Sequence, residues 1–191
     1  MTNNRERLLN KLKTQSIFFG DFTLASGAKS KVYFDCRLTT LDPEGACLVG
    51  EGMYELIHAE AARQGVTIDA VGGLTMGADP IAVAIGMTSW KKAPAEAYQI
   101  YTVRKAAKEH GKTKLIEGNF KAGMKVVVID DVVTKGDSTL KAIDAVKDAG
   151  GIVAFVAVFV DREEGGCDKI RALGYPVVSL FKRTELIPAD I

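Results

Sequence analysis

The segment from Val126 to Thr139 carries the residue types that a sugar phosphate requires. It reads V-V-V-I-D-D-V-V-T-K-G-D-S-T, so an apolar run leads to two adjacent carboxylates, Asp130 and Asp131, and then to a hydroxyl-rich turn. Paired carboxylates repel a phosphate but accept hydrogen bonds from the two hydroxyls of a ribose. Backbone N–H groups at the start of a helix bind anions, and the helix dipole adds to that attraction. A site that meets both demands fits a ribose 5-phosphate.

The turn after the carboxylates supplies the donors for that phosphate. Its residues are Val132, Val133, Thr134, Lys135, Gly136, Asp137 and Ser138. Thr134, Ser138 and Thr139 add hydroxyl donors, and Gly136 allows a ligand to approach the backbone closely. The simpler alternative is that Asp137 or Ser138 only caps the next helix, while the carboxylates only end a strand.

Two other phosphate-binding motifs do not fit this sequence. Gly72 and Gly77 have the spacing of a P-loop, but Ala78 and Asp79 stand where that loop needs Lys and then Ser or Thr. No G-x-G-x-x-G follows a predicted strand, which argues against a dinucleotide site.

A second segment, from Arg104 to Lys114, is strongly cationic. R-K-A-A-K-E-H-G-K-T-K holds five Lys or Arg residues and His110 against one Glu, and it has no apolar stripe. Such a segment can close over a leaving group that gains negative charge and stabilise the transition state more than the ground state. His110 has a reference pKa near neutrality and could assist in handling protons or charge. The alternative is an ordinary solvated basic loop.

Alternating strands and helices must position these segments. Apolar runs predict strands over residues 70–73, 97–103, 125–130, 152–160 and 176–180. Helical patterns predict helices over residues 79–89, 137–149 and 167–173. This alternation is typical of an α/β fold with an open, mostly parallel sheet, whose ligands bind outside the carboxyl ends of the strands. We therefore expect the chemistry just after Gly73, Val103, Ile129 and Val160.

The N-terminal part has a different pattern. Leu8, Leu9 and Leu12 indicate an amphipathic helix over residues 5–15, and two short strands are expected over residues 18–24 and 31–36. Asp42 and Pro43 then begin a helix that should run to about Arg63 and end near Gly65.

Composition excludes several classes of protein. The chain has 191 residues, is 47% hydrophobic and has a net charge of +1, which does not suit a general nucleic-acid binder. No apolar run reaches the length of a membrane span, and no signal-peptide pattern follows Met1. Three scattered cysteines and two histidines argue against a disulfide framework, a cysteine-based zinc site or a multi-histidine metal centre. The pattern indicates one cytoplasmic domain over residues 1–191, with no nucleic-acid or membrane partner.

The segment with the paired carboxylates closely resembles the phosphoribosyl-pyrophosphate (PRPP) motif of the type I phosphoribosyltransferases. The cationic segment, as R-K-x-x-K-x-H-G, resembles the catalytic loop of the orotate phosphoribosyltransferase branch. Three further segments are similar to that branch: F-T-L-A-S-G with Y-F-D at residues 22–35, G-G-L-T-M-G-A-D-P at residues 72–80, and V-D-R-E-E-G-G at residues 160–166. The resemblance covers about residues 18–180.

The resemblance implies a role for each segment. Asp130 and Asp131 would bind the ribose hydroxyls, and residues 132–138 would hold the rest of PRPP, with its 5-phosphate on residues 134–138. Thr75, Met76 and Gly77 would form a pyrophosphate loop. Orotate would contact Thr134, Arg162 and Phe34. The catalytic, PRPP-binding lid would comprise Arg104, Lys105, Lys108 and His110.

The implied fold and reaction follow from the same resemblance. It implies a type I phosphoribosyltransferase-like sheet, a small N-terminal hood over residues 1–40, and a mobile catalytic loop over residues 104–118 that a homodimer shares between subunits. Orotate and PRPP would give orotidine 5′-monophosphate and pyrophosphate in pyrimidine biosynthesis. Mg²⁺ would be held mainly by PRPP and water, without a protein metal site. The alternatives are a purine-salvage phosphoribosyltransferase or a non-catalytic PRPP- or nucleotide-binding regulator of the same fold.

The chain departs from the family pattern at two positions. Many members have Lys where Ala25 stands, and some have a Tyr-Lys pair where Thr75 and Met76 stand. Lys135, Lys29 and Lys31 are the candidates to supply the cations that these two positions lack.

Overall fold

The computed structural model describes residues 2–23, 27, 29–106 and 115–188 and contains a central six-stranded sheet with a separate hairpin. The sheet has the order β5-β4-β3-β6-β7-β8. Its strands are β3 (Ala70–Leu74), β4 (Gln99–Val103), β5 (Ile116–Gly118), β6 (Lys125–Val133), β7 (Ile152–Asp161) and β8 (Val177–Lys182). Every pair is parallel except β4 with β5 at one edge.

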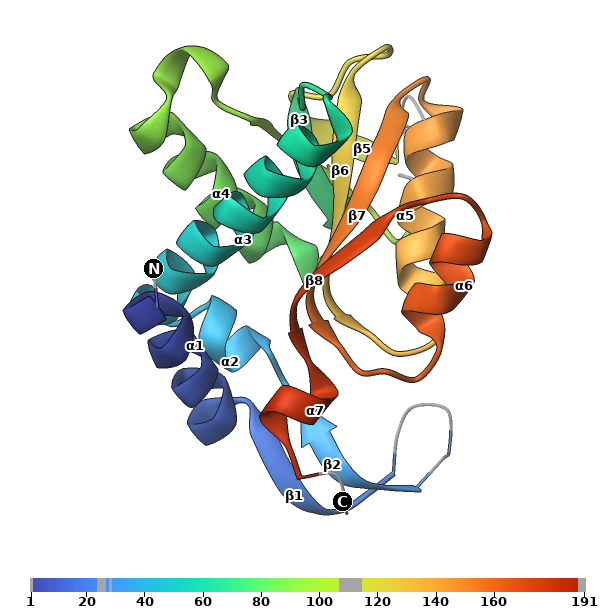
Figure 1. Ribbon diagram of the computed structural model, residues 1–191. Coiled ribbons are helices and arrows are strands. Elements are labelled where there is room, and N and C mark those ends of the chain that lie inside the picture. The colour runs from blue at the N-terminus through green and yellow to red at the C-terminus, as the bar shows by residue number, and fades with distance from the viewer. Residues whose placement is uncertain (1, 24–26, 28, 107–114, 189–191) are drawn as a thin grey trace.

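Helices cover both faces of this sheet, with α3 and α4 on one side and α5 and α6 on the other (Figure 1). Their bounds are α3 (Pro43–Gln64), α4 (Ala78–Lys92), α5 (Asp137–Asp148) and α6 (Gly166–Ala172). A 3₁₀ turn, η1 (Pro94–Glu96), follows α4. The expected alternation of strands and helices in an open α/β sheet is confirmed.

The N-terminal residues and the short helix α7 near the C-terminus form a small layer beside the sheet. It consists of α1 (Thr2–Gln15), the antiparallel hairpin β1 (Ile17–Thr23) and β2 (Lys29–Phe34), and the short helices α2 (Arg37–Thr40) and α7 (Arg183–Leu186). In Figure 1 the hairpin lies at the bottom of the view, near α7. The helix after Asp42 begins as expected, because the Asp42 carboxylate accepts a hydrogen bond from Gly45 N at 2.8 Å.

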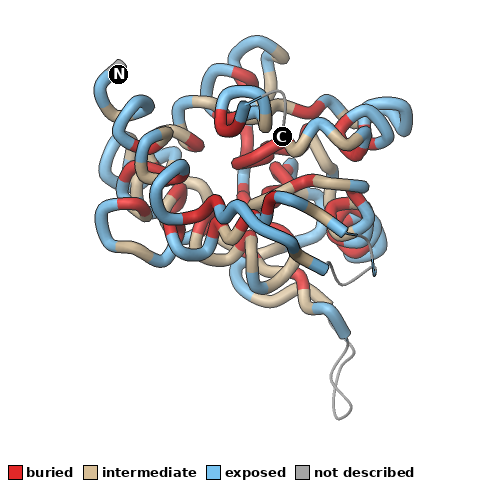
Figure 2. The backbone as a smooth tube through the Cα atoms, turned by 90° about the horizontal axis from the view of Figure 1, so that it is seen from below, coloured by how far each residue is buried: buried red, intermediate tan, exposed pale blue. Residues whose placement is uncertain are grey.

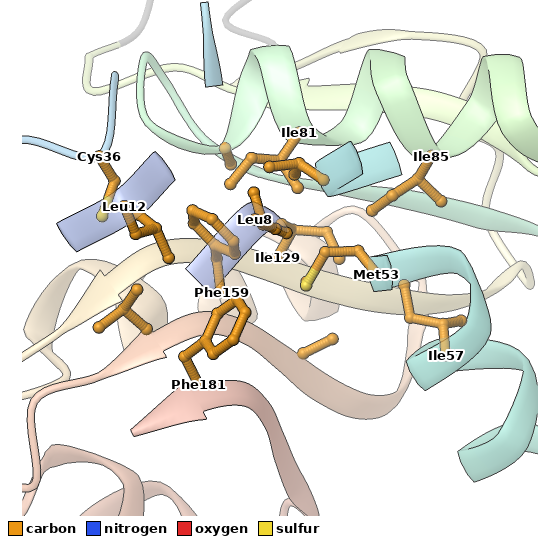
Figure 3. Packing of buried hydrophobic residues seen from close by; sticks show 14 of the residues in the cluster. Leu8, Leu12, Cys36, Met53, Ile57, Ile81, Ile85, Ile129, Phe159 and Phe181 are labelled. Atoms are coloured by element: carbon orange, nitrogen blue, oxygen red, sulfur yellow. The ribbon is translucent and has the colours of Figure 1, made fainter. Parts of the chain in front are cut away.

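The hydrophobic core consists of two layers, one on each face of the sheet. In β6, Val127 and Ile129 pack toward α3 and α4, whereas Val126 and Val128 pack toward α5, as the two-residue period of a strand requires. Leu8 belongs to the first layer, so α1 is packed against the body of the molecule (Figure 3). The buried stretches lie at the centre of the tube drawing and the exposed ones around it (Figure 2).

Several expected boundaries shift in the structure. β2 ends at Phe34, not Cys36, because the chain turns there into α2. β6 continues to Val133 instead of ending at Asp130, because Val132 and Val133 still pair with β7. The paired carboxylates therefore lie within the last residues of the strand. In the described residues no helix has the length and apolar character needed to cross a membrane.

Candidate active site

A cleft of about 350 Å³ opens where β3 and β6 end. These strands are neighbours, and the chain leaves β3 toward β4 on one side before it returns to β6 on the other. Open α/β sheets bind ligands at this kind of switch point. Three segments line the cleft, together with Lys105 and Ser138: residues 34–37 after β2, residues 74–77 after β3, and residues 130–132 in β6. The structure thus brings together four of the segments singled out from the sequence.

Asp130 and Asp131 differ in how far their carboxylates are engaged. Asp130 is 7% exposed and accepts hydrogen bonds from Ser138 Oγ at 3.0 Å, Thr139 Oγ1 at 2.5 Å and the Asp131 N–H at 3.0 Å. Asp131 is partly exposed and lines the cleft beside Gly77, where an added Cβ would lie 2.3 Å from its Oδ1. Asp131 is therefore the more accessible acceptor of the pair.

Burial raises the pKa of both carboxylates. For Asp130 the raised pKa is about 7, since desolvation and the charge of Asp131 outweigh the stabilising hydroxyls of Thr139 and Ser138. Desolvation also raises the pKa of Asp131. Burial and mutual repulsion therefore disfavour ionisation of both carboxylates at once.

Among the described residues, no side chain caps the start of α5. Its N-cap is Gly136, at φ +80°, which carries no side chain to occupy the first N–H groups. Asp137 instead forms an ion pair with Lys169 at 2.7 Å, and Ser138 donates to Asp130. The alternative in which Asp137 or Ser138 only caps the helix is therefore wrong. The 12-residue helix keeps the anion-binding end that the phosphate prediction requires.

The turn before α5 is packed tightly against the segment after β7. Gly166 N donates to Thr134 O at 2.9 Å, and a Cβ at Gly166 would lie 2.4 Å from that oxygen. Arg162 N donates to Val133 O at 3.0 Å. The Val133 side chain is buried. These contacts fix the expected phosphate loop beside Arg162.

Arg162 lies over the ring of Phe34, with its guanidinium carbon 4.2 Å from the ring centroid. Glu164 holds one end of the guanidinium, at 2.9 Å from Nη2. Among the described residues, the buried Nε has no hydrogen-bond partner. Desolvation lowers the pKa of Arg162. An aromatic face, a cation and an unused donor lie together here, next to the cleft that Phe34 lines.

The loop after β3 is held by Asp79, a residue to which the sequence analysis assigned no role of its own. Its carboxylate accepts hydrogen bonds from Thr75 Oγ1 at 2.6 Å and Thr102 Oγ1 at 2.5 Å. Thr75 N also donates to Val103 O at 2.8 Å. Asp79 therefore fastens the expected pyrophosphate loop to β4. Met76 is exposed at the tip of this loop.

The cationic segment is only partly described. Lys108 and His110 lie outside the described residues. Arg104 forms an ion pair with Glu117 at 3.5 Å, whereas Lys105 lines the cleft of its own chain. The sequence-based expectation assigned both residues to the neighbouring subunit.

The candidate replacement lysines have local partners. Lys29 donates to Thr23 Oγ1 at 2.7 Å, Lys31 pairs with Asp21, and Lys135 donates to the Glu164 carbonyl at 3.3 Å. Ala25 lies outside the described residues. Lys135 is the one of the three that belongs to the phosphate loop itself.

Asp35, Cys36 and Arg37 also line the cleft, although the sequence analysis assigned no individual role to them. The Arg37 guanidinium binds Asp35 through Nε at 2.8 Å and Nη2 at 2.9 Å, and this pairing raises the pKa of Arg37. Burial raises the pKa of the Cys36 thiol. The signal available in the sequence was their position directly after Phe34, which was already expected to contact orotate.

The chain has relatives among known proteins and among solved structures. No family model matches the chain. It is 43% identical over 189 residues to orotate phosphoribosyltransferase of Rhodopseudomonas palustris (strain TIE-1), covering 96% of both proteins. It is 43% identical over 186 residues to the orotate phosphoribosyltransferase of Aquifex aeolicus (strain VF5), covering 96% of this chain and 97% of that one. The structure of Mycobacterium tuberculosis H37Rv orotate phosphoribosyltransferase in complex with PRPP matches with a TM-score of 0.77 and 36% identity, over 96% of this chain and 98% of the other.

Proposed function

The chain belongs to the orotate phosphoribosyltransferase family, and from that premise we propose how its cleft transfers a phosphoribosyl group from PRPP to orotate. The products are orotidine 5′-monophosphate and pyrophosphate, in a step of pyrimidine biosynthesis. The observation that carries the proposal is the meeting of Asp131, the free start of α5 and the loop after β3 in one cleft that also adjoins Phe34 and Arg162.

The phosphoribosyl group is held at two points. The N–H groups at the start of α5 and the Thr134 hydroxyl bind the 5-phosphate, where the helix dipole favours an anion. Asp131 accepts hydrogen bonds from the ribose hydroxyls, and Asp130 supports it from the interior. Ser138 and Thr139 hold Asp130 in place. This arrangement fixes the reacting carbon relative to both the base and the leaving group.

Orotate binds on the Arg162 and Phe34 side. Its carboxylate and ring edge are acceptors that suit a guanidinium, and the ring can lie against the aromatic face. Thr134 contacts both the base and the 5-phosphate, because it lies in the turn before α5 and its carbonyl is hydrogen-bonded to Gly166 in the segment after Arg162. Uracil lacks the carboxylate and is therefore expected to be a very poor substrate.

The leaving pyrophosphate lies over residues 75–77. As the bond to the ribose breaks, charge grows on the pyrophosphate oxygens, so nearby cations lower the barrier. Lys105 acts within its own chain. Arg104, Lys108 and His110 form a lid that a second subunit of a homodimer supplies. Residues 1–40 act as a hood on the base side, within one domain that spans residues 1–191 and acts in the cytoplasm.

Magnesium fits this site as an ion bound to substrate. No three His, Cys, Asp or Glu side chains cluster in the described residues in a way that could hold a metal ion. Mg²⁺ prefers phosphate oxygens and water, and when bound to pyrophosphate it neutralises charge on the leaving group. The cleft residues then act on the base and the ribose as described above.

A competition experiment between bases tests the proposed function. Purified protein with PRPP and Mg²⁺ is offered orotate, hypoxanthine, adenine and uracil together, and the nucleotide products are separated and quantified. Orotidine 5′-monophosphate should account for nearly all product. A purine nucleotide as the main product would indicate the salvage alternative, and no product with any base would indicate a binding regulator.

A further inference from the structure

Arg37 is a cation in the cleft to which the proposed function has assigned no task. It lies at the start of α2 and lines the cleft together with Asp131, Met76 and Lys105. We propose that Arg37 binds the pyrophosphate group of PRPP through the outer edge of its guanidinium. This inference rests on the proposed function and names one more residue of the same site.

The guanidinium is held in a fixed orientation. Asp35 accepts hydrogen bonds from Nε at 2.8 Å and from Nη2 at 2.9 Å, a side-on pairing that uses both carboxylate oxygens. Within the described residues, the hydrogen bonds of this guanidinium leave Nη1 unused. The side chain is 48% exposed, whereas that of Asp35 is 18% exposed. Asp35 therefore acts as the anchor and Arg37 as the group presented to the cleft.

The charges that line the cleft require such a cation. The described lining residues include three carboxylates and two cationic side chains. The carboxylates are those of Asp35, Asp130 and Asp131, and the cations are Arg37 and Lys105. A substrate with a phosphate and a pyrophosphate adds several negative charges to this surface. Of these two cations, Arg37 is the one held in place by two hydrogen bonds to a neighbouring carboxylate, that of Asp35.

The loop after β3 offers few donors to the pyrophosphate by itself. The Thr75 hydroxyl donates to Asp79, and the Thr75 N–H donates to Val103 O. Met76 is uncharged and Gly77 has no side chain. Backbone N–H groups are thus all that residues 76 and 77 can supply, and a charged donor must come from another segment. Arg37 lines the cleft with these residues and can supply such a donor.

Position also favours the pyrophosphate over the other parts of the substrates. The 5-phosphate belongs to the start of α5, and the orotate side already has Arg162 over Phe34. Arg37 instead interacts electrostatically with Asp131, the carboxylate beside Gly77. It therefore faces the region between the ribose hydroxyls and the loop after β3, where the leaving group lies.

Calorimetric titration with two probes tests the assignment. Inorganic pyrophosphate with Mg²⁺ reports on the leaving-group position, and ribose 5-phosphate reports on the rest of the site. Arg37→Gln keeps much of the side-chain length without the charge, and Arg37→Lys keeps the charge without the paired geometry. Arg63→Gln is a matched control, because Arg63 makes the same two-bond pair with Glu60 on α3, which lies outside the residues that line the cleft.

Arg37→Gln should raise the dissociation constant for pyrophosphate by about tenfold or more and that for ribose 5-phosphate by less than about twofold. Arg37→Lys should restore part of the loss, and Arg63→Gln should match the unmodified protein. Unchanged pyrophosphate binding in Arg37→Gln, or an equal loss for both probes, would overturn the assignment. If Arg37→Gln does not fold, Arg37→Lys decides the question. It should raise the dissociation constant for pyrophosphate more than that for ribose 5-phosphate, and equal changes would overturn the assignment. Failure of the unmodified protein to use orotate would instead count against the proposed function.

Discussion

In the proposed reaction, recognition of the base depends most on Arg162. Its guanidinium is stacked on Phe34, and the buried Nε has no partner among the described residues. Arg162→Ala should raise the KM for orotate by about tenfold or more and change the KM for PRPP by much less. Steady-state kinetics with each substrate varied in turn measures both values. Equal effects on the two substrates would move Arg162 out of the base site.

Asp130 makes a second prediction at the residue scale, on pH and stability. Its pKa rises from about 4 in the unfolded chain to about 7 in the folded protein. The folded state therefore binds a proton more tightly, so this group's contribution is complete below about pH 4 and is lost as the pH rises to about 7. Relative to Asp130→Asn, the unmodified protein should lose unfolding free energy between pH 5 and pH 8, on the order of 1 kcal/mol or more.

Urea unfolding followed by circular dichroism at several pH values measures this difference. Asp137→Asn is the control with the opposite sign, because the hydrogen bond from Lys169 lowers the pKa of Asp137. Its contribution is lost as the pH falls, not as it rises. A constant difference between the unmodified protein and Asp130→Asn across this range would show that Asp130 titrates normally.

The candidate site was predictable where residue types alone specify the chemistry. Asp130, Asp131 and Gly136 were identified because two carboxylates and a glycine turn follow an apolar run. The engagement of Asp130 by Ser138 and Thr139 was not predictable, since it depends on how α5 packs against β6. Arg37 and Asp79 were missed for a similar reason, because their partners become visible only in the folded chain.

At the scale of elements, Asp79 joins the loop after β3 to strand β4. Thr102→Val removes one of its two hydroxyl partners while keeping a β-branched side chain in the strand. The KM for PRPP should rise by roughly threefold to tenfold, with little change in the KM for orotate, because the pyrophosphate loop loses part of its support. The exposed Thr67→Val is the control. A fall in melting temperature without a shift in the KM for PRPP would reduce Asp79 to a purely structural role.

The long elements of the fold were predictable from sequence, and the short ones were not. β6 and β7 are near-continuous runs of β-branched residues covered on both faces, which is the strongest signal for a parallel strand. The antiparallel edge strand β5 has three residues, and α2 and α7 have four each. Elements of that length carry no periodicity, so tertiary contacts decide them.

At the scale of the whole molecule, the proposed sharing of the lid between subunits predicts recovery of activity when two inactive variants are mixed. One variant carries Asp130→Asn with Asp131→Asn, and the other carries Lys108→Ala with His110→Ala. Lys105 is left unchanged because it lines the cleft of its own chain. Random exchange makes about half of the dimers mixed, and each mixed dimer has one intact site, so about a quarter of all sites should recover.

Recovery should depend on time and protein concentration, because exchange requires dissociation. Differently tagged chains verify that mixed dimers have formed. If they form and no activity returns, the lid acts within its own chain and the proposed sharing is wrong.

The most direct test of the account is the loss of orotate absorbance in the presence of PRPP and Mg²⁺, with pyrophosphate release measured in the same sample. The unmodified protein should consume orotate and release pyrophosphate in equal amounts, and chelation of the metal or omission of PRPP should stop both. Asp131→Ala should lower the rate by at least about tenfold while the protein remains folded. Orotate consumption without pyrophosphate release, or full activity in Asp131→Ala, would contradict the assignment of the reaction to this cleft.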